Sequence, residues 1–270
     1  MGILNVTPDS FSDGGRFDTL DNALSHVDEM LSWGVDIIDI GGESTRPNAP
    51  AVDSDTELGR VVPVVDAIRA RFGDEIWLSL DTSNPAVMEQ GIRAGADIVN
   101  DVRGLRGVGA REMVASLDCP VVIMHSRGEP DTMTRTMNDL ATYADVVAEV
   151  VSELGADVQN ALNAGVKREH IIIDVGMGFA KNYEHHVALM KRLGDIQAHF
   201  DLPMLFGVSR KRFLGEILGQ FTPAHNHTPA DRDVVGAVAH LLAIQQGANI
   251  VRVHDVAMMA QAIKMWQMVC

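Results

Sequence analysis

The feature that most constrains the fold of this chain is an eightfold alternation of short β-rich runs with longer helical patterns. Between the runs lie segments such as residues 20–33, 57–71, 140–164 and 234–246, whose apolar side chains recur about every third or fourth position. Strands separated by helical segments pair in parallel through crossover connections. The β-rich runs are residues 2–7, 36–42, 76–82, 97–102, 121–126, 171–175, 203–208 and 250–254.

The number of repeats selects among the parallel α/β folds. Several runs are apolar on successive residues, as in Ile171-Ile172-Ile173, which is typical of a sheet covered on both faces. An open doubly wound sheet, the alternative fold, more often stops at about five or six strands, whereas eight βα units close into a barrel. The sequence therefore predicts an α/β protein, a (β/α)8 TIM barrel that forms a single domain over residues 1–270, because no linker divides the chain.

Four glycines stand directly before predicted strands: Gly34, Gly95, Gly165 and Gly247. Glycine adopts the left-handed conformation that ends many helices without the steric cost of a Cβ atom. We expect these residues to cap helices at the end of the barrel where the strands begin.

The charge balance excludes some classes of partner. With 22 basic and 37 acidic residues the net charge is −15, so we expect no nonspecific attraction to nucleic acid or to anionic membranes. An anionic substrate would need a local cationic site. Cys119 and Cys270 have no metal or redox spacing, and the sequence shows neither a signal peptide nor a membrane span, which favours a cytoplasmic location.

Polar side chains gather where the predicted strands end, which is where parallel barrels build their active sites. Each of them also has a structural interpretation, as a helix cap, a turn residue or a solvated side chain. Because almost every strand ends this way, capping alone is a poor explanation. The residues include Asn5, Thr7, Asp39, Glu43, Asp81, Asn100, Asp101, His125, Asp174, Ser209, Arg210, Lys211, Arg252, His254 and Asp255.

Two chemistries are combined in this set. Asp81, Asn100 and Asp174 alternate with apolar residues and are predicted to point into the barrel. Buried carboxylates need donors, and the adjacent N–H groups of a 2-amino-pyrimidinone edge would supply them. A second group, Asn5, Arg46, Arg252 and His254, suits a phosphate or diphosphate with a hard metal ion.

Two weaker patterns carry less information. Residues 176–181 resemble a dinucleotide-binding loop only superficially, because the third glycine and the matching acidic residue are missing. His185-His186 and the pair His225 and His227 lack Cys or Glu partners at ligand spacing, so surface imidazoles are the simpler interpretation.

The longest motifs resemble those of the dihydropteroate synthase family, the folate-pathway target of sulfonamides. They span nearly the whole chain: residues 1–15 (MGILNVTPDSFSDGG), residues 41–47 (GGESTRP), Asp81-Thr82, Asn100-Asp101, Ser209-Arg210-Lys211 and Arg252-Val253-His254-Asp255. The resemblance implies a transferase that condenses 6-hydroxymethyl-7,8-dihydropterin diphosphate with p-aminobenzoate, forming 7,8-dihydropteroate and diphosphate. It also implies Mg2+ as cofactor, sulfonamides as inhibitors and a homodimer formed through the last three helices.

The same resemblance implies a role for each matching residue. Asp81, Lys211, Arg252 and Asn5 would be catalytic, and Asn5 would also hold the metal. The pterin would be bound by Asp81, Asn100, Asp174 and Lys211, and the diphosphate by Asn5, Arg46, Arg252 and His254. The p-aminobenzoate site would be formed by Thr45, Arg46, Pro47, Phe179 and Ser209, with Phe11 nearby, and the loop 42–50 would close over both substrates.

The chain departs from the family pattern at one turn, where Val175 and Ala180 replace a proline and a glycine. Two alternatives to a synthase remain. Methyltetrahydrofolate-dependent methyltransferases resemble this pattern but have Asn in place of Arg210-Lys211, and a noncatalytic pterin-binding paralogue would keep the barrel without turnover.

Overall fold

The computed structural model describes residues 1–7, 16–43, 52–128, 140–221 and 228–270. Within them, eight strands form one sheet in which each strand pairs in parallel with the next along the chain. All eight lie inside the runs predicted from the sequence. They are β1 (Gly2–Asn5), β2 (Ile37–Gly41), β3 (Trp77–Asp81), β4 (Ile98–Asp101), β5 (Val121–Met124), β6 (Ile171–Asp174), β7 (Met204–Phe206) and β8 (Ile250–Val251).

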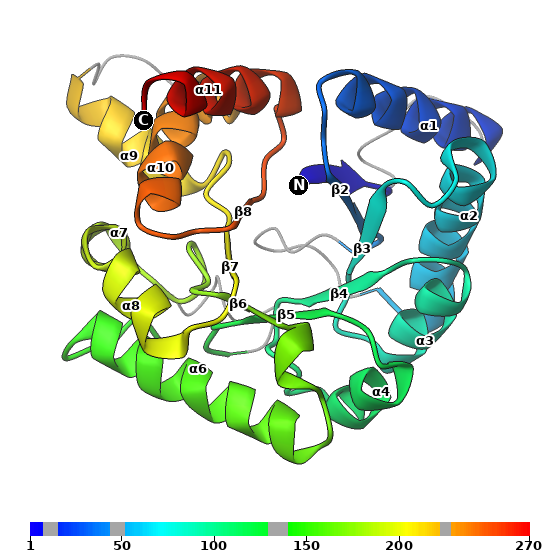
Figure 1. Ribbon diagram of the computed structural model, residues 1–270, viewed down its shortest axis with the longest axis horizontal. Helices are drawn as coiled ribbons and strands as arrows, with labels where there is room; N and C mark the ends of the chain where they lie inside the picture. Colours follow the sequence, from blue (N-terminus) through cyan, green and yellow to red (C-terminus); the bar gives the residue numbers. More distant parts are fainter. Residues whose placement is uncertain (8–15, 44–51, 129–139, 222–227) are drawn as a thin grey trace.

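The helices surround the curled sheet on its outside (Figure 1). Two short 3-10 turns, η2 (Arg168–His170) and η3 (Ala230–Arg232), lie between them in the chain. None of the described helices is long and apolar enough to cross a membrane. They are α1 (Arg16–Ser32), α2 (Ser54–Phe72), α3 (Pro85–Arg93), α4 (Ala110–Leu117), α6 (Val146–Asn163), α7 (Tyr183–Lys191), α8 (Leu193–Phe200), α9 (Arg212–Phe221), α10 (Asp233–Gln245) and α11 (Val256–Val269).

Side chains that begin and end these helices explain their boundaries. A carboxylate or amide oxygen accepts a backbone N–H of the first turn at Asp53, Asn84, Asp145, Asn182 and Asp255. The four glycines predicted as caps all adopt positive φ, from 76° at Gly34 to 116° at Gly95. Asp255, a polar residue at a strand end, thus serves a helix cap.

The two faces of the sheet have different cores. Outward residues such as Ile38, Leu78 and Val99 are fully buried against the helices. Inward residues alternate with them, because successive side chains of a strand point to opposite faces. Near the start of the strands these inward residues form a separate apolar cluster of Met1, Ile37, Ile98, Val122, Ile172, Leu205 and Ile250.

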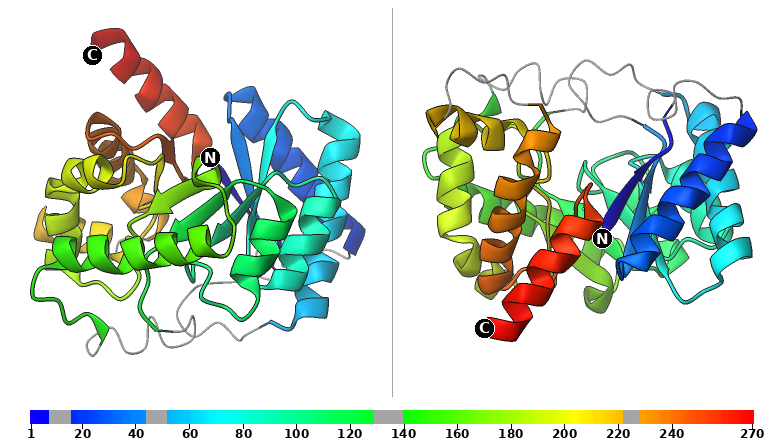
Figure 2. Two further views of the ribbon diagram at one scale, coloured as in Figure 1. Left: turned by 60° about the horizontal axis from the view of Figure 1, so that its bottom comes forward. Right: turned by 90° about the horizontal axis from the view of Figure 1, so that it is seen from above.

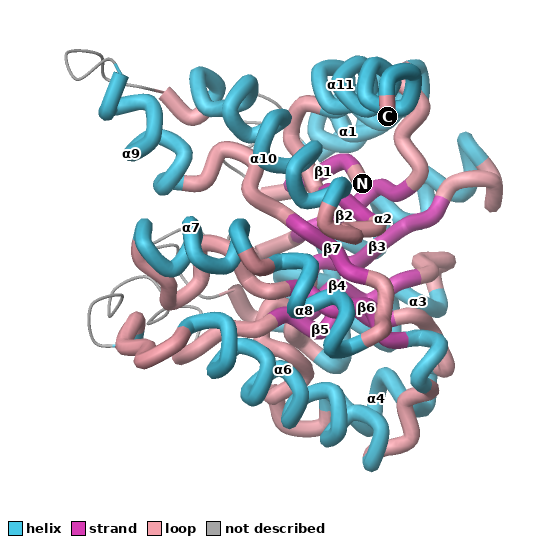
Figure 3. Tube along the Cα trace, turned by 60° about the vertical axis from the view of Figure 1, so that its left-hand side comes forward, coloured by secondary structure: helices cyan, strands magenta, loops and turns pink. Residues whose placement is uncertain are grey.

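Two positions further along five of these strands, the inward residue is polar or is glycine: Asp39, Asn100, Asp174, Gly207 and Arg252. A dry floor therefore underlies a polar layer at the carboxyl ends of the strands. Figure 3 shows the neighbouring strands lying side by side. The register places the apolar residues Ile3 and Met124 beside Asp39 and Asp174, so the polar layer is interrupted on β1 and β5.

The two edges of the sheet meet at a seam that differs from the prediction. In the described residues the regular ladders run from β1 to β8, and one isolated parallel bridge joins Gly2 to Val253. Two backbone hydrogen bonds of 3.0 Å, from Ile3 to Val253 and from Val253 to Met1, accompany it. The expectation of a barrel closed by continuous ladders is corrected to a curled sheet with a narrow seam, because β8 has only two residues.

The N-terminus lies at this seam, beside the start of α11 (Figure 2). The Met1 ammonium donates to the Val251 carbonyl at 3.0 Å and is buried, and that burial lowers its pKa to about 6. A side chain on Gly2 would collide with Met30 and Val256, so the glycine allows α1 and α11 to approach β1.

Candidate active site

One guanidinium joins two carboxylates, one fully buried and one half-buried, at the centre of the polar layer. Arg252 Nε donates to Asp39 Oδ2 at 2.5 Å, and its Nη2 donates to Asp81 Oδ2 at 2.6 Å. Asp39 also accepts from Ser79 Oγ at 2.6 Å and from the Asn100 amide at 3.2 Å. Residues from β2, β3, β4 and the end of β8 are therefore connected through Asp39.

Burial shapes the charges of this group. It raises the pKa of Asp81 to about 7, although the positive charge of Arg252 opposes the shift. For Arg252, burial acts to lower the pKa, but the carboxylates of Asp39 and Asp81 outweigh it and hold the pKa above its ordinary value. The guanidinium is therefore permanently charged, and Asp81 can change its charge near neutral pH.

Asp174 and Lys211 form the second charged pair. Asp174 is buried at the end of β6, where its Oδ1 accepts the Gly176 N–H at 2.7 Å. Burial raises the pKa of Asp174, and the nearby Lys211 is the largest opposing influence. Burial also lowers the pKa of Lys211 to about 8, while the charge of Asp174 acts to raise it.

Lys211 contacts the turn after β6 and the aromatic ring of Phe179. Its Nζ donates to the Met177 carbonyl and lies 4.5 Å from the Phe179 ring centroid. Gly178 makes room for it, because a Cβ atom there would lie 2.8 Å from Lys211 Cδ. The half-buried Phe179 ring therefore lies next to an ammonium at the rim of the polar layer.

Gly41 leaves space between Asn5 and Asp81. A Cβ atom at residue 41 would lie 3.6 Å from Asn5 Oδ1 and 3.7 Å from Asp81 Oδ2. The register places Asn5 beside Gly41 and Gly41 beside Asp81, so all three occupy one inward row. Asn5 is only half-buried and offers a neutral oxygen at this row.

Ser209 and His254 contact each other beyond the ends of β7 and β8. Ser209 Oγ accepts the His254 N–H at 3.1 Å and lies 2.9 Å from His254 Nδ1. Both are half-buried and follow β7 and β8. The family resemblance implies that they bind different substrates, and the structure places them in contact with each other.

The structure thus brings together most of the residues expected to form a site. Hydrogen bonds join Asp39 to Arg252 and to Asn100, and Arg252 also donates to Asp81. An adjoining group contains Asp174, Lys211 and Phe179. Asn5, Ser209 and His254 lie at the same strand ends. Four expected residues, Phe11, Thr45, Arg46 and Pro47, lie outside the described residues.

Asp39 and Lys181 are the functional candidates that the sequence interpretation did not assign to the site. Asp39 was noted only as a polar strand residue, although its alternation with Ile38 and Ile40 already places it inward. Asp101, by contrast, is structural, because its carboxylate accepts the N–H groups of Arg103 and Leu105 at 2.8 and 2.9 Å.

Chemically, this layer offers carboxylate and amide acceptors deep inside and cations nearer the rim. The described residues contain no cluster of three His, Cys, Asp or Glu side chains that could hold a metal ion by themselves. A flat, donor-rich heterocycle would satisfy the inner acceptors, and an anionic group would be attracted to Arg252 and Lys211.

Comparisons with known proteins agree with this chemistry. A family model described as "Pterin binding enzyme" matches residues 1–254. A dihydropteroate synthase of Haemophilus influenzae is 44% identical over 268 residues, which cover 99% of this chain and 92% of that protein.

Solved structures give the same result. The dihydropteroate synthase of Xanthomonas albilineans with 4-aminobenzoic acid superposes with a TM-score of 0.89 at 43% identity, covering 100% of this chain and 92% of the other. The same enzyme in complex with 7,8-dihydropteroate gives 0.86 at 40% identity, with coverages of 100% and 92%. The Yersinia pestis enzyme with a sulfonamide drug complex gives 0.88 at 41%, with coverages of 99% and 92%.

Proposed function

The chain belongs to the family of pterin-binding enzymes, and from this premise we propose that it is a dihydropteroate synthase. It condenses 6-hydroxymethyl-7,8-dihydropterin diphosphate with p-aminobenzoate and releases diphosphate. The observation that carries the proposal is the joint presence of the Asp39–Arg252–Asp81 group and the Asp174–Lys211 pair in one layer. Relatives over 40% identical across nearly the whole chain have this activity.

Asp174 and Asn100 are proposed to hold the pterin ring. Asp174 is buried, and among the described residues the Gly176 N–H donates to its Oδ1. A ligand that presents two adjacent N–H groups would offset that desolvation cost through bidentate hydrogen bonds. Lys211, beside Asp174, would donate to the acceptor atoms of the same ring.

Asp81 and Arg252 are proposed to stabilise opposite charges during the reaction. When the C–O bond to the diphosphate breaks, positive charge develops on the exocyclic methylene group of the dihydropterin and negative charge on the leaving group. The Asp81 carboxylate would stabilise the cation, and Arg252 and His254 would bind the departing anion. The p-aminobenzoate nitrogen then forms the new C–N bond and loses a proton, so no protein nucleophile is required.

The residues of this site fit a magnesium ion that is held mainly by its substrate. Mg2+ prefers hard oxygen ligands and is often bound by one or two protein oxygens together with substrate phosphates. Asn5 Oδ1 supplies one such oxygen in the space left by Gly41, beside Asp81. The ion would neutralise charge on the diphosphate. We propose Asn5 as its protein ligand.

The p-aminobenzoate is proposed to lie at the rim, between Phe179, Lys211 and Ser209. Lys211 over the Phe179 ring provides an aromatic wall next to a cation, which suits a small benzoate. Sulfonamides have the same shape and would compete for this position. Thr45, Arg46, Pro47 and Phe11 remain predicted contributors.

We further propose that the chain forms a single domain and that two copies associate as a homodimer. Apolar side chains are exposed at intervals of four residues on α10, at Val234, Val238 and Leu242, and neighbouring α11 exposes Met265, Met268 and Val269. Such a patch is typical of an interface between subunits.

The Gly2–Val253 bridge supports closure of the (β/α)8 barrel at the seam. The cytoplasmic location stays a prediction.

The proposed activity is tested by measuring diphosphate release from purified protein with Mg2+. Release should require both the pterin diphosphate and p-aminobenzoate. Asp174→Asn and Lys211→Ala should lose pterin binding or turnover while the melting temperature stays nearly unchanged. Pterin binding without release in the wild-type protein would instead support a noncatalytic pterin-binding paralogue.

A further inference from the structure

Lys181 is a fully buried lysine, and the charges of Asp174 and Lys211 both act on it. Its Nζ lies 2.9 Å from His125 Nδ1 and 3.1 Å from the carbonyl oxygens of Gly176 and Phe179. An ammonium has three protons, so these three acceptors satisfy all of them.

The imidazole of His125 is held in the tautomer that accepts from Lys181. His125 Nε2 lies 3.1 Å from Glu153 Oε2, an oxygen that can only accept when ionised. Nε2 therefore carries the proton and Nδ1 keeps its lone pair. Burial together with the charge of Lys181 lowers the pKa of His125 to about 3, so the ring stays neutral.

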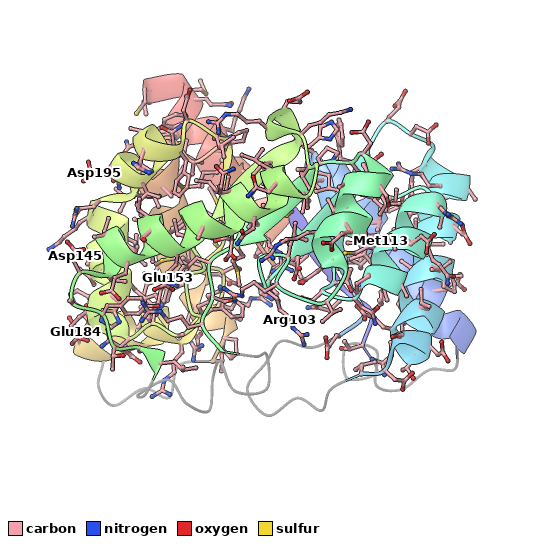
Figure 4. All side chains as sticks on the ribbon, turned by 90° about the horizontal axis from the view of Figure 1, so that it is seen from below. Arg103, Met113, Asp145, Glu153, Glu184 and Asp195 are labelled. Atoms are coloured by element: carbon pink, nitrogen blue, oxygen red, sulfur yellow. The ribbon has the colours of Figure 1, made fainter. Side chains whose placement is uncertain are left out.

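Glu153 fixes the far end of this chain of contacts to α6, from which it projects (Figure 4). Arg127 Nε donates to its Oε2 at 3.0 Å, and the same guanidinium donates to Glu149 at 2.8 Å. Successive contacts between Lys181, His125, Glu153 and Arg127 thus connect the turn after β6 with the segment after β5 and with α6.

The turn that Lys181 holds is strained and carries site residues on both sides. Gly176, Gly178 and Ala180 all have positive φ, of 67°, 88° and 49°. Ala180 is the residue that replaces a family glycine, and its Cβ atom makes the left-handed conformation unfavourable. The turn keeps the Gly176 N–H on Asp174 and the Met177 carbonyl on Lys211.

Stability alone is a poor reason to bury this lysine. Burial lowers the pKa of Lys181 to about 7, which means that the surroundings compensate only part of the lost hydration. An apolar side chain of the same length would avoid that cost. A buried charge that holds a strained turn next to a binding site points to a role in preorganising the site.

We propose that Lys181 is a positioning residue for the reaction: through Gly176, Phe179 and His125 it holds the turn of residues 176–180 in the one conformation that aims Asp174 at the pterin and Phe179 with Lys211 at the p-aminobenzoate. This inference rests on the proposed synthase function. Lys181 itself touches neither substrate.

The test compares Lys181→Met with the wild-type protein and with Lys191→Met, a matched change at an exposed lysine at the end of α7. Three quantities are measured far below the melting temperature: the Kd for the pterin diphosphate alone, the KM for p-aminobenzoate, and kcat. We expect Lys181→Met to raise the Kd and the KM about tenfold or more and to lower kcat less. Lys191→Met should match the wild type.

A merely structural role would lower the melting temperature of Lys181→Met and leave its Kd and KM within about twofold of the wild type, and that result would overturn the proposal. If Lys181→Met does not fold, Glu153→Gln decides, because Glu153 is 38% exposed and the change preserves its size. It weakens the tautomer preference of His125, so we expect a threefold or larger rise in the pterin Kd. An unchanged Kd there would then reject the proposal.

Failure of the proposed function is recognised separately, in the wild-type protein. If the wild type binds pterin diphosphate but does not release diphosphate with p-aminobenzoate, the synthase activity is rejected, and the Kd comparison still decides the role of Lys181 in pterin binding.

Discussion

At the scale of single residues, Asp39 organises the centre of the site without being placed to touch the reacting atoms. It is fully buried and accepts hydrogen bonds from Arg252, Asn100 and Ser79. Two of these partners are proposed ligand-binding residues. The orientation of the guanidinium and of the amide is therefore set by a third side chain beneath them.

Asp39→Asn should lower kcat/KM about 100-fold, because the new amide N–H group faces the donors of Arg252 and the change removes one of the two carboxylates that pair with this charge. Steady-state kinetics with both substrates measure the effect. Asp36→Asn is the control, since Asp36 is exposed and begins the same strand region. Activity of Asp39→Asn within threefold of the wild type would contradict this role.

The pH dependence of kcat/KM follows from groups that must lose a proton to act and groups that must keep one. Asp81 must be ionised to stabilise a cation, and its raised pKa of about 7 removes that charge as the pH falls. Lys181 and Lys211 must be protonated, and their lowered pKa values of about 7 and 8 remove their charges as the pH rises. We expect kcat/KM to have a narrow maximum at about pH 7, measured between pH 5.5 and about 9.5. A flat profile over this range would refute the assignment.

At the scale of elements, the turn after β6 has the least freedom to change. Gly176 has a φ of 67°, and a Cβ atom there would lie 1.8 Å from the His125 carbonyl oxygen. The backbone of residues 174–180 would have to move away from β5, and the Gly176 N–H would leave Asp174. The observed position of Asp174 therefore requires glycine at residue 176.

Gly176→Ala should therefore destabilise the protein by about 2–4 kcal/mol and weaken pterin binding at least tenfold. Chemical denaturation and calorimetric titration measure the two effects. Gly59→Ala is the matched control, because Gly59 is an exposed residue of α2 whose added Cβ would touch nothing. That variant should gain up to about 1 kcal/mol. Tight pterin binding by Gly176→Ala would show that the turn does not set the position of Asp174.

The sequence predicted the elements better than their junctions. The eight runs and the four glycine caps were identified from periodicity and from the position of glycine, which are local signals. The seam was not, because the number of backbone hydrogen bonds between β8 and β1 depends on the curvature of the whole sheet. The inward position of Asp81, Asn100 and Asp174 followed from alternation along the strands.

The importance of Asp39 and Lys181 could not be obtained in the same way. Alternation places Asp39 inward, but its three partners come from other strands, up to 213 residues away at Arg252. Lys181 ends the glycine-rich segment 176–181, which resembles a dinucleotide-binding loop only superficially, and only the folded chain shows its ammonium turned inward to His125. Long-range pairings of this kind leave no local trace in the sequence.

At the scale of the whole molecule, the exposed apolar patch on α10 and α11 predicts self-association. Val238→Glu with Leu242→Glu should convert a dimer to a monomer at micromolar concentration, because like charges would face each other across a two-fold interface. Light scattering measures the mass. Val108→Glu, at a 99% exposed valine between β4 and α4, is the control and should not alter it. A monomeric wild-type protein would contradict the dimer.

The whole molecule separates a dry floor from a charged rim, and this separation determines how the substrate is oriented. The apolar cluster of Met1, Ile98, Val122 and Leu205 closes one end of the inner face, and the acceptors of Asp174 and Asn100 lie above it. Arg252 and Lys211 are nearer the solvent, as their half-buried side chains show. A heterocycle with an anionic tail should therefore enter ring first.

The most direct measurement is a crystal structure of the protein with pterin diphosphate bound. The account predicts that the amino-pyrimidinone edge lies on the Asp174 carboxylate with Asn100 alongside, and that the diphosphate extends toward Arg252 and His254. Density for the pterin in any other part of the molecule, with Asp174 and Asn100 unligated, would contradict it.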